Sequence, residues 1–309
     1  MASIYKDNVE YPCGGNNSTA YFAQRALSDD MGNKIRDTYM GIKSGAGYHN
    51  SIFVDEDITS LYESGELYTR ISNGTFDGLF VGMHFTAQYD GKPVVFRIAG
   101  FDIYLNNGDT ALTRHHAVIV PDSALCNAQM NASNTTEGAY YGSKMRNETI
   151  LGSGGVDEKL TATFGSHLLS FRELLSKTMN PDSVSGGYPG YKGASSDWAW
   201  YDSKSDLMSE VEVYGSAICG SSFFDVGSAK AQLPLFALAP HLINPGRFLW
   251  WLRAVVSSTN FANVNNNGNA NNNNASNSNG VRPRFTVIYR KIRLKYTMSK
   301  GGSYPSLIY

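Results

Sequence analysis

The sequence predicts a mixed α+β fold, and three observations lead to this prediction. Charged residues make up only 17% of the chain, while Gly (31) and Tyr (19) are abundant, a composition that suits strands and loops better than a helical bundle. Several β-branched or aromatic runs are separated by turn residues, which is typical of strands joined by tight connections. Short stretches with helical spacing lie between these runs. Strands and helices that segregate along a chain indicate an α+β domain.

The N-terminal quarter of the chain has no obvious core of its own. Two helices are expected here, over residues 19–27 and 31–40, and glycines follow the second one. From residue 78 onward, apolar runs with strand character begin. We therefore expect an N-terminal extension over residues 1–75 and one domain over residues 76–309.

Six runs in the domain have strand character. Turn signals such as Asp90-Gly91 and Asn106-Asn107-Gly108 separate the first three runs. The predicted strands are 79–89, 94–105, 115–121, 207–215, 250–256 and 284–298.

Two helices are expected in the middle of the domain. One lies near residues 139–145, after the N-cap-like start that Asn134-Thr135-Thr136 form before Glu137. The second covers residues 167–175. Its apolar side chains share one face at three- and four-residue spacing, namely Leu168, Phe171, Leu174 and Leu175.

Charge and cysteine content argue against several classes of protein. The 26 basic and 27 acidic residues leave a net charge of -1, so a nucleic-acid-binding surface is not expected. The three cysteines, Cys13, Cys126 and Cys219, lie too far apart to indicate a disulfide framework or a zinc site. No apolar run approaches the ~18 residues of a membrane span. The N-terminus lacks the features of a secretory signal, so we expect synthesis in the cytoplasm without membrane insertion.

Residues 260–279, NFANVNNNGNANNNNASNSN, form the most distinctive segment, the Asn-rich tract. Asn occupies 12 of these 20 positions, whereas the other 289 residues hold 14. Low complexity of this kind can form a flexible linker. Strand-like runs lie on both sides of the tract, however, and the remainder of the chain is too short for a second domain. The tract is therefore predicted to be a long loop, or a set of short strands and loops, displayed by a folded scaffold.

The Asn-rich tract and its flanks resemble a known family. Trp250-Trp251-Leu252-Arg253 precede the tract and Gly280-Val281-Arg282-Pro283-Arg284-Phe285 follow it. This segment, about residues 250–285, is similar to the variable region of target proteins of diversity-generating retroelements. Less specific pieces upstream, such as His115-His116-Ala117-Val118-Ile119-Val120-Pro121, extend the resemblance over roughly 80–290.

The resemblance implies a C-type-lectin-type domain and a non-enzymatic binding role without cofactor or metal. In that family a reverse transcriptase miscopies the adenines of a template repeat, and the copy replaces the variable repeat of the gene. The Asn codons, AAC and AAT, carry adenine at the two positions that most change the amino acid. An Asn-rich tract therefore looks like an unscrambled, template-like version.

Many members of that family are phage or prophage receptor-binding proteins. The resemblance thus implies a phage virion protein, assembled in the bacterial cytoplasm, whose N-terminal region attaches to other virion proteins and which can form homotrimers. The expected ligand is a bacterial surface protein or glycan. A diversified binder displayed on the bacterial cell surface is the alternative.

A diversified site needs exposed variable side chains on a backbone that core contacts hold in place. The expected ligand-binding residues are Asn260, Asn263, Asn265, Asn266, Asn267, Asn269, Asn271, Asn272, Asn273, Asn274, Asn277 and Asn279. The expected scaffold residues are Trp250, Trp251 and Phe285 in the core, Phe261 and Val264 as inward anchors, Arg253 and Arg282 as donors to loop carbonyls, and Gly268 and Gly280 at turns.

Other constellations give weaker signals. His115 and His116 with Asp102, Asp109 and His167 match no metal-ligand spacing, and the two adjacent histidines are expected to start a strand.

Glu210 and Glu212 alternate on one face of a predicted strand, where we expect them to be solvated or paired with Arg. Formylglycine-generating enzymes use a similar fold with a catalytic cysteine pair. Cys126 and Cys219, the two cysteines of the domain, lie in strand-like or turn contexts, which argues against that chemistry. An enzyme on the same fold is the third hypothesis. The Asn-rich tract has no Asp or Glu, which argues against calcium-mediated sugar binding.

Overall fold

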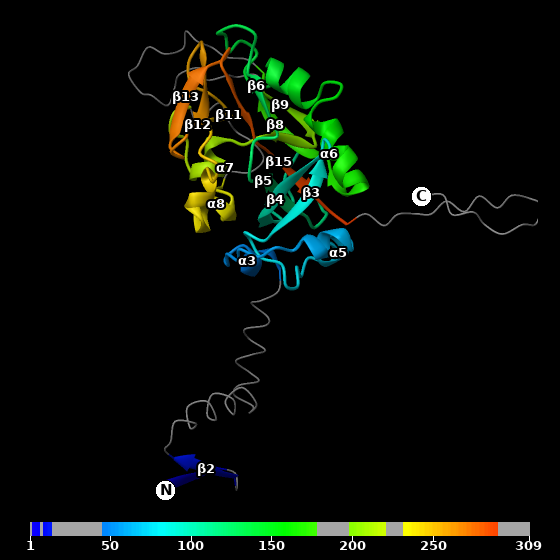
Figure 1. The fold of residues 1–309 in the computed structure, drawn as a ribbon, viewed down its shortest axis with the longest axis vertical. Helices are drawn as coiled ribbons and strands as arrows, with labels where there is room; N and C mark the ends of the chain where they lie inside the picture. Colours follow the sequence, from blue (N-terminus) through cyan, green and yellow to red (C-terminus); the bar gives the residue numbers. More distant parts are fainter. Residues whose placement is uncertain (1, 7–8, 14–44, 178–197, 221–230, 290–309) are drawn as a thin grey trace, which may run out of the picture.

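A computed structural model of the chain describes residues 2–6, 9–13, 45–177, 198–220 and 231–289. These residues form a mixed α+β fold of antiparallel sheets and short helices (Figure 1), as the sequence predicts. The helices predicted over 19–27 and 31–40 lie outside the described residues. No helix in the described part of the chain is both long enough and apolar enough to span a bilayer.

The larger sheet has the strand order β10-β15-β5-β4-β3, and β7 also pairs with β15. Tyr89 faces Lys92 across a tight turn in which Asp90 and Gly91 have φ values of 50° and 73°. Positive φ at both central residues is what a two-residue hairpin turn requires. The strands of this sheet are β3 (His84–Tyr89), β4 (Lys92–Phe101), β5 (Ala117–Pro121), β7 (Leu168–Leu169), β10 (Ser205–Leu207) and β15 (Pro283–Val287).

The second sheet has the order β13-β12-β11-β14-β6. Its neighbouring strands are antiparallel except β11 and β14, which run parallel. Figure 1 shows β12 and β13 on the side of the molecule away from α6. The strands are β6 (Cys126–Gln129), β11 (Trp250–Val255), β12 (Asn260–Val264), β13 (Ala270–Asn274) and β14 (Ser278–Val281).

Two separate hairpins complete the strands. One pairs β1 (Ala2–Lys6) with β2 (Val9–Cys13), and the other pairs β8 (Phe171–Ser176) with β9 (Trp198–Ser203). The helix predicted over 167–175 is therefore wrong. Phe171, Glu173 and Leu175 are buried in alternation, the period of a strand. This period is hidden in the sequence because its middle member is a charged residue.

The helices are short and lie at the margins of the sheets. They are α3 (Ala46–His49), α4 (Thr59–Glu63), α5 (Glu66–Ser72), the π-helical turn η1 (Met145–Ile150), α6 (Val156–Phe164), the 3₁₀ turn η2 (Gly165–His167), α7 (Glu210–Tyr214), α8 (Pro234–Leu238) and the 3₁₀ turn η4 (Pro240–Ile243). The helix predicted near residue 139 is not formed there, because Ala139 has a φ of 50° and the helical turn begins only at Met145.

The strand predicted over 207–215 is also wrong beyond its first residue. The main-chain N–H of Glu212 donates to the Ser209 side chain, and the Glu212 carboxylate accepts the Ser209 N–H in return. This reciprocal capping box starts helix α7, and Gly215 ends it with a φ of 81°. Glu210 therefore lies on a helix, where its buried carboxylate accepts backbone N–H groups of residues 218–220.

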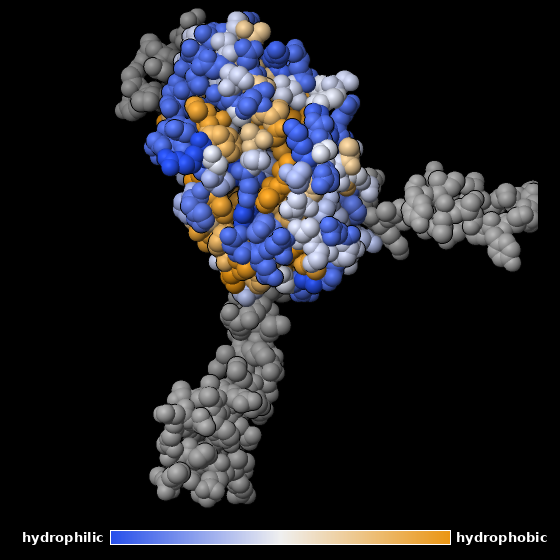
Figure 2. Space-filling view, viewed as in Figure 1, coloured by the Kyte–Doolittle hydropathy of each residue, from blue (hydrophilic) through white to orange (hydrophobic). Residues whose placement is uncertain are grey.

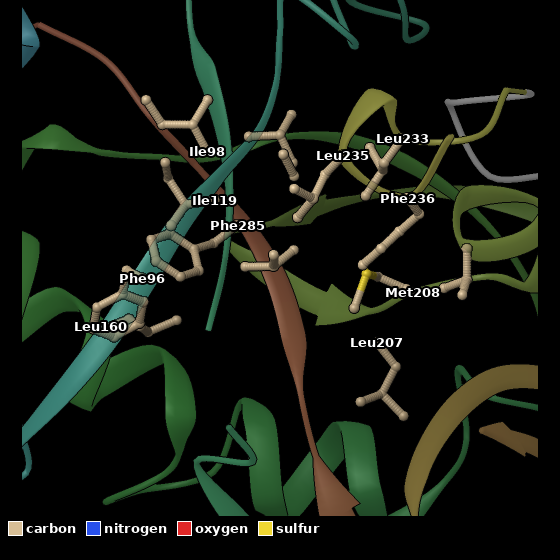
Figure 3. Packing of buried hydrophobic residues seen from close by; sticks show 14 of the residues in the cluster. Phe96, Ile98, Ile119, Leu160, Leu207, Met208, Leu233, Leu235, Phe236 and Phe285 are labelled. Carbon is tan, nitrogen blue, oxygen red and sulfur yellow. The ribbon is translucent and has the colours of Figure 1, made fainter. Parts of the chain in front are cut away.

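One apolar core joins the two large sheets and the helices. Figure 3 shows Phe96, Ile119 and Phe285 together, on strands β4, β5 and β15. The ring centroids of Phe96 and Phe285 are 5.6 Å apart at an interplanar angle of 80°, an edge-to-face contact that aromatic pairs favour.

The described part of the predicted extension belongs to the same core. Ile58, Leu67 and Ile71 are buried in it, and residues of 45–75 pack against the large sheet through α3 and α4. Residues 45–75 therefore pack against the domain predicted over residues 76–309.

Candidate binding surface

The Asn-rich tract forms three strands of the second sheet. It runs through β12, a turn that contains Gly268, then β13, and enters β14. Gly268 has a φ of 86°, so its predicted place in a turn is confirmed. The tract is thus a set of short strands and turns built into the scaffold, as expected, and does not separate two domains.

The asparagines of the tract differ in exposure. Asn260, Asn265 and Asn273 are half-buried. The exposed side chains are those of Asn266, Asn267, Asn269, Asn271, Asn272, Asn274 and Asn277. Figure 2 shows hydrophilic residues along the outer margin where Figure 1 places β13, and hydrophobic residues beside them toward β11. The exposed side chains of the tract are chiefly amides.

Two asparagines expected at the surface are buried instead. Asn263 is 1% exposed and Asn279 is 6% exposed. Asn263 lies opposite Trp251 in the β11–β12 pair, and Asn279 lies in β14, which has β11 and β6 on its two sides. Because both side chains are almost completely removed from solvent, these two positions cannot serve as ligand contacts in this conformation.

Residues outside the tract hold the backbone of its first turn. The Tyr214 hydroxyl donates to the carbonyl oxygen of Gly268 at 2.9 Å, and the Asn244 side chain donates to the carbonyl oxygen of Asn265 at 2.7 Å. Both contacts go to main-chain atoms. Side chains in the turn can therefore change without loss of these two bonds.

The second turn is held in the same way. Gln129 donates from its side chain to the carbonyl oxygen of Ser276 at 2.5 Å, and the N–H of Asn131 donates to the carbonyl oxygen of Ala275 at 3.0 Å. The Asn134 side chain accepts the N–H of Ser276 at 3.2 Å. The β6 strand and the loop after it thus support the turn between β13 and β14.

Some asparagines of the tract also hold one another. The Asn265 side-chain oxygen accepts the N–H groups of Asn267 and Asn269 at 2.8 and 3.1 Å, which closes the first turn. The Asn273 side-chain oxygen accepts the N–H of Asn274 at 3.0 Å and the amide of Asn277 at 2.5 Å. The side chains of Asn265 and Asn273 therefore make structural hydrogen bonds. The exposed side chains of Asn266 and Asn267 make none to the described residues.

The apolar scaffold residues are buried as predicted. Trp250, Trp251, Phe261, Val264 and Phe285 are all fully buried. The indole N–H of Trp251 donates to the carbonyl oxygen of Ala128 in β6 at 2.9 Å. Gly280 differs from the prediction, because it lies inside β14 rather than at a turn. A Cβ there would come within 2.8 Å of the Ala124 Cβ, so close packing explains this glycine.

Arg282 confirms the predicted role as a buried donor to carbonyls. Its guanidinium donates to the carbonyl oxygens of Pro121 and Ile243, each at 2.7 Å, and to that of Leu242 at 3.2 Å. It also lies 5.1 Å from the ring centroid of Trp250. Burial lowers the pKa of Arg282 to about 10, so the group stays charged at neutral pH.

Arg253 is buried as predicted, but its main partners are carboxylates rather than carbonyls. Its guanidinium lies 2.7 Å from Glu173 Oε1 and 3.6 Å from Glu212 Oε2. Arg284 pairs with the same two carboxylates, and its Nε is 3.0 Å from Glu212 Oε1. All four side chains are 2% exposed or less. The charges of the two guanidinium groups balance those of the two carboxylates. This buried charged box joins β8, α7, β11 and β15.

Sequence reasoning identified neither carboxylate of this box as buried, and it did not single out Tyr214, Asn244, Gln129 or Asn134 as supports of the tract. For Glu212, the Ser209-x-x-Glu212 pattern was an available signal for a capping box. The other contacts join residues far apart in the chain, and no local sequence pattern predicts them.

The remaining candidate groups have structural partners. The His115 ring is 2.7 Å from Asp102 Oδ2, and the His116 N–H donates to Asp102 Oδ1 at 2.9 Å. His167 stacks on Tyr68 at a centroid distance of 3.7 Å. No group of three or more His, Cys, Asp or Glu side chains positioned to hold a metal occurs among the described residues.

The chemistry of the surface follows from its side chains. The Asn-rich tract contains no acid, base, cysteine or aromatic residue other than Phe261, which is buried. Amides offer hydrogen-bond donors and acceptors but have no titratable group at neutral pH. The tract therefore offers hydrogen-bond donors and acceptors, and it holds no side chain that titrates near neutral pH.

Part of the chain is similar to a known protein family. A family described as Domain of unknown function (DUF6273) matches residues 144–288, a region that includes the buried charged box and the whole Asn-rich tract. No curated protein matches the chain. No solved structure matches it either.

Proposed function

We propose that this chain is a non-enzymatic ligand-binding protein whose Asn-rich tract is a retroelement-diversified surface on a C-type-lectin-type domain. The observation that carries the proposal is that the side chains of the tract are exposed while residues outside it hold its backbone. Seven of its asparagines are exposed, while Tyr214, Asn244 and Gln129 hold its main chain from outside. A surface built in this way can exchange side chains and keep its backbone.

The physical requirements of a diversified surface support this interpretation. Exposed positions away from special structural features tolerate substitution within about 0.5 kcal/mol. Four of the five apolar residues interspersed in the tract, Phe261, Ala262, Val264 and Ala275, are fully buried, Ala270 is half-buried, and none of the five has an Asn codon. Substitutions that start from Asn codons therefore leave these anchors in place.

The biological setting that we propose follows the family resemblance. The chain acts as a phage virion adhesin that binds a bacterial surface protein or glycan, and its N-terminal region attaches to other virion proteins, with a trimer as the proposed assembly. In the all-Asn state the surface offers no exposed aromatic side chain in the tract. Because polar, wet interfaces without aromatic anchors gain little affinity, this version binds its ligand weakly.

Sequencing the locus in many sibling isolates tests the proposal. We expect substitutions at Asn codons of the seven exposed positions, accompanied by a neighbouring reverse-transcriptase gene and an adenine-rich template repeat. The 14 asparagines outside the tract are the matched control and should stay constant. Substitutions spread evenly over all 26 asparagines, 12 in the tract and 14 elsewhere, or a tract that never varies, would contradict the proposal.

Adjacent genes distinguish the two settings. Virion structural genes next to this locus support the phage adhesin, whereas envelope or secretion genes support a binder displayed on a bacterial surface. Both outcomes are consistent with a diversified binding surface. They distinguish only whether the protein acts on a phage virion or on a bacterial surface.

A further inference from the structure

Strand β13 lies at the open edge of the second sheet. Among the strands that the structure describes, β13 pairs only with β12. An edge strand presents unpaired N–H and C=O groups that can pair with another chain. Proteins usually guard such edges with charged side chains, proline or a bulge. The Asn-rich tract has no charged residue and no proline.

The register shows which groups of β13 face outward. The N–H of Asn265 donates to the carbonyl of Asn269, and the N–H of Ala275 donates to the carbonyl of Thr259. In an antiparallel pair, hydrogen-bonded and non-hydrogen-bonded positions alternate. The odd-numbered residues 271 and 273 therefore bond to β12, while the N–H groups of residues 270, 272 and 274 face the open edge.

Two of these outward donors are already occupied by side chains. The N–H of Asn272 donates to the Asn271 side-chain oxygen at 2.9 Å, and the N–H of Asn274 donates to the Asn273 side-chain oxygen at 3.0 Å. In each case the residue before the donor supplies the acceptor. A local acceptor competes with any incoming strand for the same N–H.

We propose that Asn271 and Asn273 close the β13 edge, and that residues without a side-chain acceptor at these two positions open it to antiparallel pairing with β13 of a second copy of this chain. The edge suits its own copy because an antiparallel pair centred on Asn272 places Ala270 opposite Asn274. No charge in the tract opposes that approach.

This edge closure goes beyond ligand binding and does not depend on it. It means that substitutions that remove the side-chain acceptor at 271 and 273 alter self-association, whereas substitutions at the neighbouring positions 272 and 274 do not. Valine is a relevant replacement, because changing both adenines of an Asn codon can produce a Val codon. In a diversified population, self-association would then vary with two positions of the tract.

Sedimentation velocity on the full chain over a range of concentrations tests the proposal. The double variant Asn271→Val/Asn273→Val should associate beyond the state of the wild type, with a dissociation constant at least about tenfold lower. The matched control Asn272→Val/Asn274→Val removes two amides and adds the same apolar area to the same strand, and it should behave like the wild type. The variant Asn271→Asp/Asn273→Asp keeps the acceptor oxygens and should also resemble the wild type.

Amide hydrogen exchange supplies a second measurement that needs no stable complex. In the wild type the N–H groups of residues 272 and 274 should exchange slowly at every concentration. In the first variant they should exchange rapidly when dilute and slowly when concentrated. Equal association of the two Val pairs, or exchange rates in the first variant that do not depend on concentration, would overturn the proposal.

Discussion

Asn263 lies directly opposite Trp251 in the β11–β12 pair, with 1% of its surface exposed and no hydrogen-bond partner for its amide among the described residues. A buried polar group without a partner costs about 1–3 kcal/mol. We therefore expect Asn263→Val to raise the free energy of unfolding by about 1–2 kcal/mol, because valine favours strands and removes the unpaired amide. Equilibrium denaturation in urea measures the change.

Asn274→Val is the control for this prediction. It makes the same substitution in the neighbouring strand, at a position that is fully exposed, and should change stability by no more than about 0.5 kcal/mol. If Asn263→Val instead lowers stability, a bound water that satisfies the amide would be the explanation.

Asn273 is expected to be the least replaceable asparagine on the exposed side of the tract. Its side chain bonds to the N–H of Asn274 and the amide of Asn277, and donates to Asn279 at 3.4 Å. Asn273→Ala should lower the free energy of unfolding by about 1–2 kcal/mol. Asn266→Ala should leave the melting temperature nearly unchanged. Equal effects of the two substitutions would show that the Asn273 contacts add nothing to stability.

Much of the scaffold could be predicted from local patterns. The tight turn at Asp90-Gly91, the strands around 84–89 and 117–121, and the burial of Trp250 and Trp251 all follow from turn chemistry and apolar periodicity. These features depend on neighbours in the chain, which the sequence displays directly. Even the placement of the Asn-rich tract in the scaffold could be inferred from the strand-like runs on both sides.

The wrong predictions share one cause: polar residues that the sequence pattern places at the surface are buried in the fold. Glu173 lies within the segment predicted as a helix, yet it is buried in a strand, where Arg253 and Arg284 neutralise it. Asn263 and Asn279 have the same side chain as their exposed neighbours, so composition cannot separate them. Which asparagine is buried depends on the register of β12 and β14 against β11, and that register is a property of the whole sheet.

The buried charged box predicts a loss of stability in acid. Burial alone would raise the pKa of Glu212, but Arg284 and Arg253 lower it to about 2, below its ordinary value of 4.5. Because the pKa of Glu212 is lower in the folded protein than in the unfolded chain, its ionised carboxylate stabilises the fold above pH 4.5. This contribution is lost as the pH falls from about 5 towards 2. Glu212→Gln should remove that part of the pH dependence and lower stability at pH 7 by about 3–5 kcal/mol, because it leaves a buried cation without its partner.

The exposed residue Glu63 supplies the control for the acid experiment. Glu63→Gln should leave both the stability at pH 7 and the shape of the acid transition close to those of the wild type. A Glu212→Gln protein that keeps the full acid transition would assign that transition to other carboxylates.

Asp157 predicts the opposite pH dependence. Burial raises the pKa of this carboxyl to about 6, against the hydrogen bond from Ser205, and the nearby Asp206 raises it further. The folded protein holds this proton more tightly than the unfolded chain, so the contribution of Asp157 to stability improves as the pH falls from about 7 to 4. Asp157→Asn should therefore raise stability at pH 7 by about 1–2 kcal/mol and have little effect at pH 4. Unfolding curves at the two pH values compare the effects, and a substitution that is equally destabilising at both would contradict the raised pKa.

Tyr214 connects the stability of the scaffold to the binding surface, because its hydroxyl holds the carbonyl of Gly268 in the first turn of the tract. Tyr214→Phe removes this single bond and keeps the ring, so we expect a loss of about 0.5–1.5 kcal/mol and faster amide exchange at Gly268, whose N–H donates to the carbonyl of Asn265. Tyr141→Phe, at a half-buried tyrosine outside the tract, should not change exchange in that turn. In a variant selected for ligand binding, Tyr214→Phe should weaken affinity mainly through the added cost of ordering the turn. Unchanged exchange at Gly268 would mean that Asn244 and the sheet are sufficient to hold the turn, and that Tyr214 is not part of the support.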